Sequence, residues 1–422
     1  MRRQLTLLGA LLLLLAPAAP AQETAARSLT LEEFLASAFE RSPDLRARRA
    51  EVEEARGRQL AARTYPFNPA ISVSAAGRRG AGGSSTDSGV EVEQEIEVGG
   101  QRARRTAVAD ASLRGAEARY ERERQLLASR VELAFAEAVQ ARELLGIEEA
   151  DAALADDLLR FEEKRLEAGE TTQIDLNLAR AVAGRSHRRA ELARGAYLQA
   201  RSALAETAGL APAVSPVPTG GLETRVDGLP PLAELVSAAL ARRQDVAAFR
   251  SAEEEAQAQV RLQQSLAVPN LVARAFRDRE AGTDTISGAG LSVGIPLFNR
   301  NRGGVAEARA AADHAAAETA ASRLAVEREV ASALAAYQAA SAAAEGLRGQ
   351  VIGTLQENLR LLQRSFEEGK IGRSELFLFR RELVDGQREY LDAALQARQA
   401  RVRLELAAGR IATPNEPNRR VP

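Results

Sequence analysis

The chain has 422 residues, a formal net charge of −1 at pH 7 and no cysteine. The near-neutral charge gives no general attraction to nucleic acid, so no nucleic-acid partner is expected. The lack of cysteine excludes disulfides, thiolate-bound metal or redox centres, and a lipid-modified cysteine at the start of a processed chain.

Residues 1–21 have the features of a cleaved export signal. Two arginines near the start precede an apolar run from Leu5 to Leu15, and a small-residue cleavage site follows at Ala19 to Ala21. We therefore expect the mature chain to begin at Gln22. No later stretch approaches 18 consecutive apolar residues, so the sequence predicts no transmembrane helix. Any passage through a membrane would have to use strands.

The sequence repeats itself with an offset of about 200 residues. Residues 31–45 (LEEFLASAFERSPDL) resemble residues 232–246 (LAELVSAALARRQDV), and Gly209 matches Gly409. Apolar residues recur every seven positions in both halves, at Leu176, Ala183, Ala190, Tyr197 and Leu204, and again at Leu376, Leu383, Tyr390, Ala397 and Leu404. We therefore predict an internal duplication.

The boundary between the two copies lies at 212–231, a stretch with five prolines that is typical of an extended linker. The expected organisation is a first repeat over residues 22–211, this linker, a second repeat over 232–410, and a C-terminal tail over 411–422.

Each repeat is expected to open with helices. Thr30 and Glu33 have capping-box spacing, and Ser42-Pro43 is typical of the start of a second helix, which is expected to end near Arg63. Long proline-free segments rich in Ala, Arg, Glu and Leu follow later, at Arg102–Ala168 and Arg302–Glu368. At ~1.5 Å per residue, each predicts a rod of roughly 100 Å.

Each rod is expected to end at a glycine turn, Gly169 or Gly369, followed by a returning helix of about 35 residues. Judged from these helices alone, a soluble coiled-coil scaffold is an equally good interpretation.

Two strand pairs interrupt the helices at matching places, within about 70–98 and 270–297. In the first pair Val90 to Val98 alternates apolar residues with glutamates, which predicts one apolar and one acidic face. The glycine-rich stretches Gly77–Gly89 and Gly282–Gly288 are predicted to be loops.

Four strands cannot close a membrane barrel, because the smallest barrels use ~8, and an open sheet edge is not tolerated in lipid. Three chains would supply twelve strands, with the acidic face toward water and the valine and isoleucine face toward lipid. The alternative is a small soluble β-domain beside a coiled coil.

The chain resembles the TolC-like outer-membrane efflux proteins along nearly its whole mature length. The resemblance is carried by the opening "LTLEEFLASAFERSPDL", by the "NP" before the first strand, and by "TTQIDL" and "GRSELF" after the glycine turns. "EIEVGGQRARR" and "IPLFNRNRGG" are similar to the heavy-metal-efflux branch, the CzcC-like proteins.

This resemblance implies a mainly α-helical fold with a β-barrel part. A homotrimer would share a twelve-stranded transmembrane barrel and extend it as an α-helical barrel in the periplasm of a Gram-negative bacterium. It also implies docking to a periplasmic adaptor and to an inner-membrane pump, commonly of the RND class.

The resemblance further implies an acidic ring at the closed periplasmic entrance. Glu375 occupies the matching position, Asp175 is its first-repeat counterpart, and Leu378 replaces a second acid that well-known members carry. Asp175 equally suits a capping box with Thr172, and Glu375 suits the first turn of a helix. The expected adaptor-docking tips are Gly169, Thr171, Thr172, Gly369, Lys370 and Gly372.

Signals for catalysis are absent from the sequence. His187 and His314 stand alone in helical segments without a metal-binding motif, the glycine runs lack a phosphate-loop pattern, and the alternating Arg/Glu surface is typical of solvated helices. We expect no enzyme activity, no cofactor and no resident metal. The predicted function is a passive exit duct for metal cations or small toxic compounds, with a type I protein-secretion channel or a periplasmic coiled-coil scaffold as alternatives.

Overall fold

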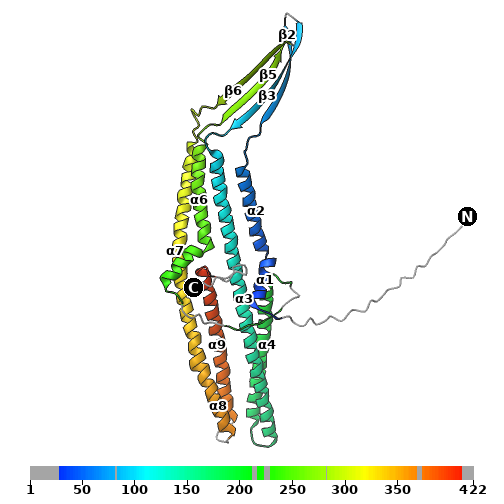
Figure 1. Cartoon of the computed structure of the whole chain (residues 1–422). Helices are drawn as coiled ribbons and strands as arrows, with labels where there is room; N and C mark the ends of the chain where they lie inside the picture. Colours follow the sequence, from blue (N-terminus) through cyan, green and yellow to red (C-terminus); the bar gives the residue numbers. More distant parts are fainter. Residues whose placement is uncertain are drawn as a thin grey trace, which may run out of the picture.

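A computed structural model describes residues 28–80, 83–211, 216–222, 229–281, 283–367 and 373–410. The molecule is long and thin, with a β-sheet at one end and helices running away from it to the other (Figure 1). The expected signal (1–21), the tail (411–422) and part of the expected linker lie outside the described residues. Within the linker, β4 (Val217–Pro218) pairs in parallel with β1 (Ser28–Leu29).

The first repeat opens as the sequence predicts. The helix α1 (Leu31–Arg41) carries the capping box of Thr30 and Glu33, and α2 (Pro43–Arg63) has Ser42 as its N-cap and Pro43 in its first turn. In the second repeat α5 (Leu232–Arg242) and α6 (Gln244–Ser265) take the same places without side-chain caps.

The two repeats have matching cores. Phe34 and Ala38 of α1 are buried, and so are Leu235 and Ala239 at the corresponding positions of α5. These side chains pack against the long helices of their own repeat, together with the end of the returning helix. The duplication predicted from sequence is therefore present as two similar packing units.

Both strand pairs join one sheet. It consists of β2 (Ala70–Gly80), β3 (Gly83–Ile96), β5 (Leu271–Glu280) and β6 (Asp284–Val293), all antiparallel and in the order β2-β3-β5-β6. The predicted loops at 77–89 and 282–288 were wrong in extent. Most of those residues extend the strands, because pairing between β2 and β3 and between β5 and β6 supplies backbone hydrogen-bond partners that glycine and serine can use.

The first long rod is α3 (Gln101–Glu167), of 67 residues. The second is not uniform: α7 (Arg302–Gly346) is followed by a π-helical segment, Leu347–Ile352, and then by α8 (Gly353–Glu367). This departs from the single α-helix that we expected. The segment contains Gly349 and is flanked by Gly346 and Gly353, residues that hold an α-helix weakly.

The returning helices are α4 (Gln173–Thr207) and α9 (Arg373–Ala407), each of 35 residues. All five ladder residues on α4 are buried. On α9 Ala397 and Leu404 are buried and Leu383 and Tyr390 are half-buried.

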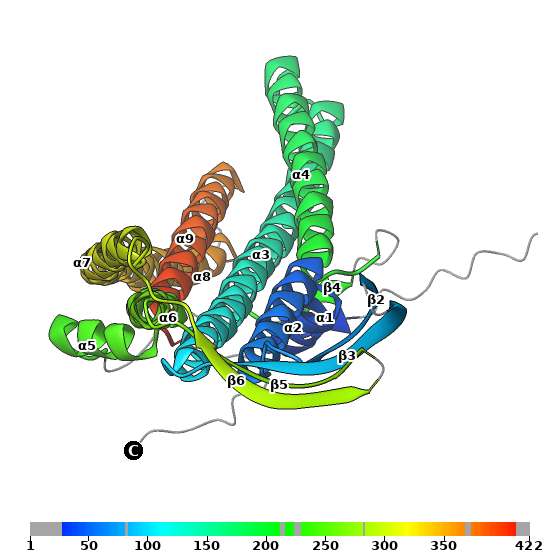
Figure 2. The same cartoon turned by 90° about the horizontal axis from the view of Figure 1, so that it is seen from above.

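The helices form a single curved layer. Below the sheet α7, α6, α3 and α2 lie in a row, and the strands curve in an arc across its end (Figures 1 and 2). Farther from the sheet, α9 lies in line with α6 and α4 lies in line with α2, so that the row of helices extends to the other end of the molecule. At these junctions Arg41 lies against Gly209, and Arg242 and Arg243 lie against Gly409. The result is a wall one helix thick, with two open side edges.

Candidate functional site

The sheet has two chemically different faces. Residues paired across antiparallel strands point to the same side, and β3 pairs Val90 with Val73 and Val92 with Ile71. The same side carries Ala275 and Leu291 of the second repeat. Ile71, Val73 and Leu291 are 70%, 77% and 73% exposed. This confirms the apolar face predicted for β3 and extends it across all four strands.

The opposite face carries the acids of β3, and Val272, Phe276 and Ile286 of the second repeat also lie on it. Glu91, Glu93 and Glu95 point to it from β3, beside Arg274 of β5. Toward the far end Arg78 donates to Asp87 at 2.9 Å and lies 3.5 Å from Glu280. This face can hold water and attract cations.

Glu97 does not belong to that face, contrary to the predicted alternation through Val98. The strand ends at Ile96, and the Glu97 carboxylate forms an ion pair with Arg105 of α3 while only 6% of its side chain is exposed.

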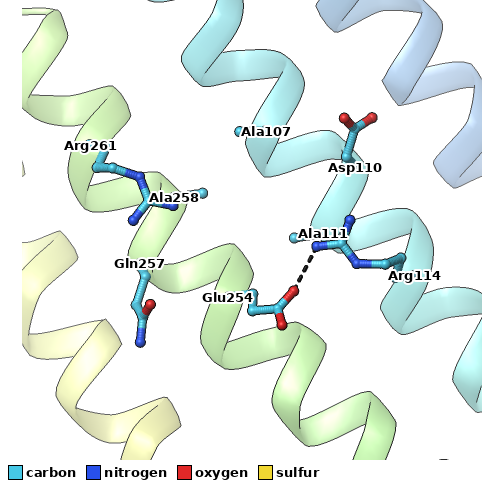
Figure 3. A pocket seen from close by; sticks show the side chains of 8 residues that line it. All are labelled: Ala107, Asp110, Ala111, Arg114, Glu254, Gln257, Ala258 and Arg261. Carbon is cyan, nitrogen blue, oxygen red and sulfur yellow. Dashed lines mark hydrogen bonds and ion pairs between the residues drawn. The ribbon is translucent and has the colours of Figure 1, made fainter.

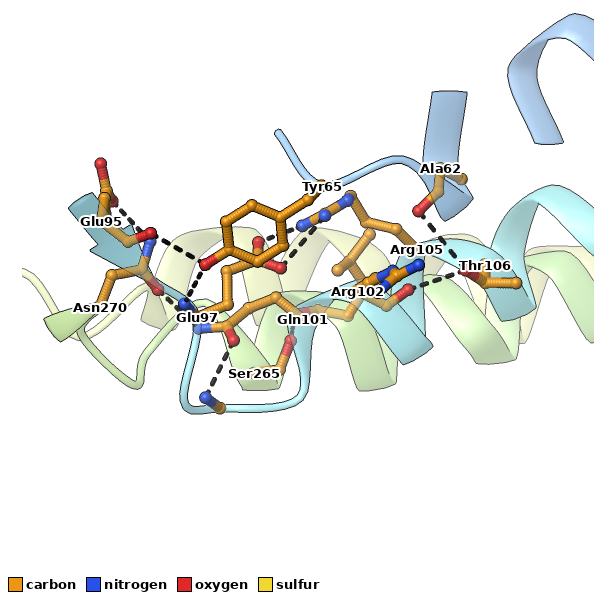
Figure 4. A network of polar contacts seen from close by, with 12 residues as sticks. Ala62, Tyr65, Glu95, Glu97, Gln101, Arg102, Arg105, Thr106, Ser265 and Asn270 are labelled. Atoms are coloured by element: carbon orange, nitrogen blue, oxygen red, sulfur yellow. Dashed lines mark hydrogen bonds and ion pairs between the residues drawn. The ribbon is translucent and has the colours of Figure 1, made fainter. Parts of the chain in front are cut away.

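A dense polar network joins the sheet to the helices (Figure 4). The Tyr65 hydroxyl donates to the Glu95 carbonyl at 2.9 Å and accepts from the Glu97 amide at 3.0 Å. Buried Gln101, at the start of α3, donates to the Val268 carbonyl and to Asn270 Oδ1, both at 3.1 Å. The network ties both repeats together where strands become helices.

The glycines before Gln101 serve this junction. Gly100 has a φ of 70°, a left-handed conformation that glycine adopts without strain. A Cβ on Gly99 would lie 2.8 Å from Val268 Cβ. The "GGQ" motif thus has a structural role at the junction between sheet and helices, which was not predicted from the sequence.

A shallow groove of about 330 Å³ lies between α3 and α6 (Figure 3). Arg114 of α3 donates to Glu254 of α6 at 2.6 Å across it, and both side chains are about half exposed. The remaining lining residues are Ala107, Asp110, Ala111, Gln257, Ala258 and Arg261. The groove is a seam between neighbouring helices that an ion pair already bridges.

The α3–α4 tip brings together the predicted residues of the first repeat. Gly169 has a φ of 74°, and the Gly169 and Glu170 amides donate to the Leu166 and Arg165 carbonyls, so this glycine ends α3 as a C-cap. Thr172 and Asp175 form a complete capping box at the start of α4.

The Asp175 carboxylate is held by that cap. Its Oδ2 accepts hydrogen bonds from the Thr172 hydroxyl at 2.7 Å, from the Thr172 amide at 3.1 Å and from the Thr171 hydroxyl at 3.1 Å. These bonds, with the Thr172 hydroxyl foremost, lower the pKa of Asp175 below its ordinary value. The carboxylate is exposed and ionised, and it faces its own helix end.

The second tip is described only in part. Glu375 lies in the first turn of α9, and Leu378, one turn later, is 63% exposed. Gly369, Lys370 and Gly372 lie outside the described residues.

A buried cluster of charges links the two repeats above the tips. Arg388 of α9 donates from Nε and Nη2 to the Glu148 carboxylate of α3, at 2.6 and 2.8 Å, and it also pairs with Asp385. Asp151 accepts from Arg189 at 2.7 Å and from buried Ser186 at 2.8 Å. Glu148 and Asp151 are thus buried, whereas the sequence reading placed the Arg/Glu surface of the rods in solvent.

Both histidines are exposed but not isolated from acids. His187 Nε2 lies 2.8 Å from Asp156 Oδ1 on the neighbouring helix, and His314 lies 3.7 Å from Glu318. The interpretation that each histidine stands alone was therefore wrong, because helix packing brings Asp156 to His187. Within the described ranges no group of three or more His, Cys, Asp and Glu residues is placed to hold a metal ion. Among the same residues no helix is long and apolar enough to cross a membrane.

Sequence reasoning missed Gln101, Asn270 and the Glu148–Arg388 pair. Gln101 had a usable signal in the two glycines before it. Glu148 and Asp151 carry only i, i+3 spacing, which many solvated helix acids share, and their partner Arg388 lies 240 residues away from Glu148.

The chain is similar to several known proteins. It is 27% identical over 390 residues, 92% of this chain and 91% of the other, to the cobalt-zinc-cadmium resistance protein CzcC of Cupriavidus metallidurans. Its fold matches a crystal structure of a membrane protein from Pseudomonas aeruginosa with a TM-score of 0.72 and 21% identity, covering 90% of this chain and 92% of that one. The outer membrane protein VceC of Vibrio cholerae matches with a TM-score of 0.70 and 20% identity, covering 90% and 96%.

The family model described as outer membrane efflux protein matches residues 34–210 and again residues 235–410. The two matched stretches coincide with the two packing units of the fold. The chain therefore belongs to the outer membrane efflux protein family, as two tandem copies of its repeat in one outer-membrane protein.

Proposed function

We propose that this protein is the outer-membrane exit duct of a tripartite efflux system, and that three copies form one passage for metal cations or small toxic compounds. The observation that carries the proposal is the sheet, with an apolar face, an acidic face and two unpaired edges. The duct performs no reaction of its own, because an inner-membrane pump of the RND class supplies the energy.

The open edges require further strands. Among the described residues β2 and β6 each pair with one neighbour only. Unpaired backbone groups cannot lie in lipid, and four strands are too few to close a barrel of ~8 or more. Pairing of β6 with β2 of the next copy closes twelve strands around the acidic faces.

The helical wall supports the same assembly. Apolar side chains lie exposed at both of its side edges. On α4 Ile174, Leu178 and Leu192 are 79%, 61% and 61% exposed, and on the opposite edge Leu324 and Leu361 are each 51% exposed. Side-by-side packing of three copies would cover them, and burial of such surface yields about 25 cal/mol per Å².

Cations are the favoured cargo on two grounds. Glu91, Glu93 and Glu95 would line the passage in every copy, and an acidic wall concentrates cations. The relative CzcC is named for resistance to cobalt, zinc and cadmium.

The helix tips would form the periplasmic entrance. We propose that Glu375 forms an acidic gate ring and that a periplasmic adaptor docks on the tips, at Gly169, Thr171, Thr172, Gly369, Lys370 and Gly372. Asp175 is the weaker gate candidate, because its carboxylate already caps α4.

The shared barrel can be tested by cysteine cross-linking, since the natural chain contains no cysteine. Ile71→Cys on β2 should be combined in turn with Ala289→Cys, Leu291→Cys and Val293→Cys on β6. These edges lie on opposite sides of the sheet in one chain, so a disulfide between them must join two copies. At least one register should give a covalent trimer in outer-membrane fractions.

A matched control is Ile71→Cys with Ala273→Cys on the interior strand β5, which should yield no trimer. Failure of every β2–β6 pair, or recovery of the protein in the soluble periplasm, would overturn the duct and favour a periplasmic scaffold.

The cargo is tested by deletion. The deleted strain should lose resistance to cobalt, zinc and cadmium ions while its resistance to lipophilic drugs changes less. Unchanged metal sensitivity would remove the metal assignment, and loss of a secreted protein instead would support a type I secretion channel.

A further inference from the structure

Three arginines lie on the same face of the sheet as the apolar residues. In the ladder Arg277 is paired with Val90 and Ser287, Arg279 with Ser88 and Thr285, and Arg79 with Ser84. Because paired residues share a side and alternate residues of a strand return to it, these arginines lie on the same face as Val73 and Leu291. All three are exposed.

The apolar residues and the arginines occupy different parts of that face along the strands. Starting from the helices, successive rungs carry Ile96 with Leu271 and Val293, then Gln94 with Ala273 and Leu291, then Val92 with Ala275, and only then Val90 with Arg277. Gln94 is the one polar residue of β3 in these rungs, and its amide donates to the Phe67 and Glu95 carbonyls. At ~3.3 Å per residue these rungs span roughly 20 Å. The apolar surface continues past the strand end, where Ile295 and Leu297 are 75% and 65% exposed. The length is close to the ~25 Å apolar band of membrane barrels.

The arginines therefore begin where the apolar band ends, at the end of the sheet farthest from the helices (Figure 1). If the helices are periplasmic, this end meets the outer leaflet. The inference thus rests on the proposed placement of the sheet in the outer membrane.

The surroundings of these arginines contain hydroxyls and no acids. Their rungs on this face carry Ser84, Ser88, Thr285 and Ser287, with Thr86 between them. Within the described part of the chain, none of the three arginines has an ion pair. Arg78, adjacent in sequence to Arg79 but on the opposite face, pairs with Asp87 and lies near Glu280. Arg78 is thus neutralised on the acidic face, whereas Arg79, Arg277 and Arg279 keep a free charge on the apolar one.

We propose that Arg79, Arg277 and Arg279 form a binding site for the phosphate groups of outer-leaflet lipid headgroups. A guanidinium binds phosphate through two parallel N–H donors, and neighbouring hydroxyls can donate further hydrogen bonds. A cation at the boundary of the apolar band meets the headgroups without entering the hydrocarbon. In a trimer the site occurs three times around the barrel and fixes its height in the membrane.

The test uses the full-length purified trimer in a neutral detergent, titrated with diphosphorylated lipid A and with the same lipid after chemical removal of its phosphates. The wild type should bind the phosphorylated lipid at least tenfold more tightly, and this preference should shrink as salt rises. The triple variant Arg79→Gln/Arg277→Gln/Arg279→Gln should lose the preference. The triple Arg→Lys variant should keep a salt-sensitive part of it.

Arg274→Gln is the matched control, because Arg274 lies on the same strand as Arg277 but on the opposite face. It should bind like the wild type. Equal binding of the two lipids by an inserted wild-type trimer, or full binding by the Arg→Gln triple variant, would overturn the site while leaving the duct intact. Recovery of the wild type outside the outer membrane would overturn the proposed function and this site together.

Discussion

The buried Arg388–Glu148 pair offers a quantitative test of how the two repeats hold together. Arg388 belongs to α9 and Glu148 to α3, so this contact crosses from one repeat to the other. We consider Arg388→Met, which keeps an unbranched apolar stem but removes the guanidinium.

The cost follows from the geometry. The Glu148 side chain is 6% exposed and accepts two charge-assisted bonds from Arg388, at 2.6 and 2.8 Å. Removal of one partner of a fully buried pair costs about 3–5 kcal/mol. Two features lower this figure: Arg388 is 21% exposed, and Arg189 lies 3.4 Å from the same carboxylate. We expect a loss of about 2–3 kcal/mol in the local stability of α9.

Hydrogen exchange of the purified protein measures this loss directly, because amides on α9 around Arg388 report local opening. At 1.4 kcal/mol per factor of ten, exchange there should accelerate about 30- to 140-fold. Arg381→Met is the control, since Arg381 is 63% exposed and lies 3.9 Å from Asp385. An exposed pair contributes about 0–1 kcal/mol, so that variant should change exchange by at most about fivefold.

The double variant Arg388→Met/Glu148→Met separates a charge effect from a packing effect. Replacement of both members of a buried pair is often nearly neutral, so most of the lost protection should return. Unchanged exchange in Arg388→Met, or further loss in the double variant, would refute the view that an uncompensated Glu148 charge sets the cost.

Three further outcomes are expected. The lowered pKa of Asp175 means that its carboxylate stabilises the start of α4 at pH values above its ordinary pKa, and that this stabilisation is lost as pH falls through the lowered pKa. Hydrogen exchange at residues 172–176, corrected for intrinsic rates, should therefore become faster as pH falls through that range. The Asp175→Asn variant should abolish this pH dependence. Glu375→Gln should weaken block by divalent cations in planar bilayers, and unchanged block would remove that residue from the gate. Neutralising Glu91, Glu93 and Glu95 to glutamine should shift the reversal potential in a salt gradient toward lower cation preference, whereas an unshifted potential would contradict an acidic lining.

Much of the architecture could be predicted from the periodicity of the sequence and from its capping residues, prolines and glycines. The capping box at Thr30, the proline start of α2 and the 67 residues of α3 are local properties, because a helix closes its hydrogen bonds within its own segment. The offset of about 200 residues predicted two similar units, because two stretches of similar sequence fold alike. The seven-residue ladder that helped to show this offset lies buried on α4.

The extent of the strands and the burial of charged residues could not be predicted as well from the sequence. The glycine-serine stretch reads as a loop, yet it becomes strand once β2 and β3 pair. The π-helical segment at Leu347–Ile352 interrupts a run whose composition predicts a uniform helix. The extent of the strands depends on the backbone partners that a neighbouring strand supplies.

The sequence by itself therefore determined export, duplication, the helices and the two faces of β3, because each depends on residues close together in the chain. Only the tertiary structure decided that the two strand pairs form one sheet in the order β2-β3-β5-β6, that Glu148 is buried against Arg388, and that Arg79, Arg277 and Arg279 share the apolar face. Register and burial arise from pairing between distant segments. The residues next to a polar side chain in sequence do not indicate which distant partner it will contact.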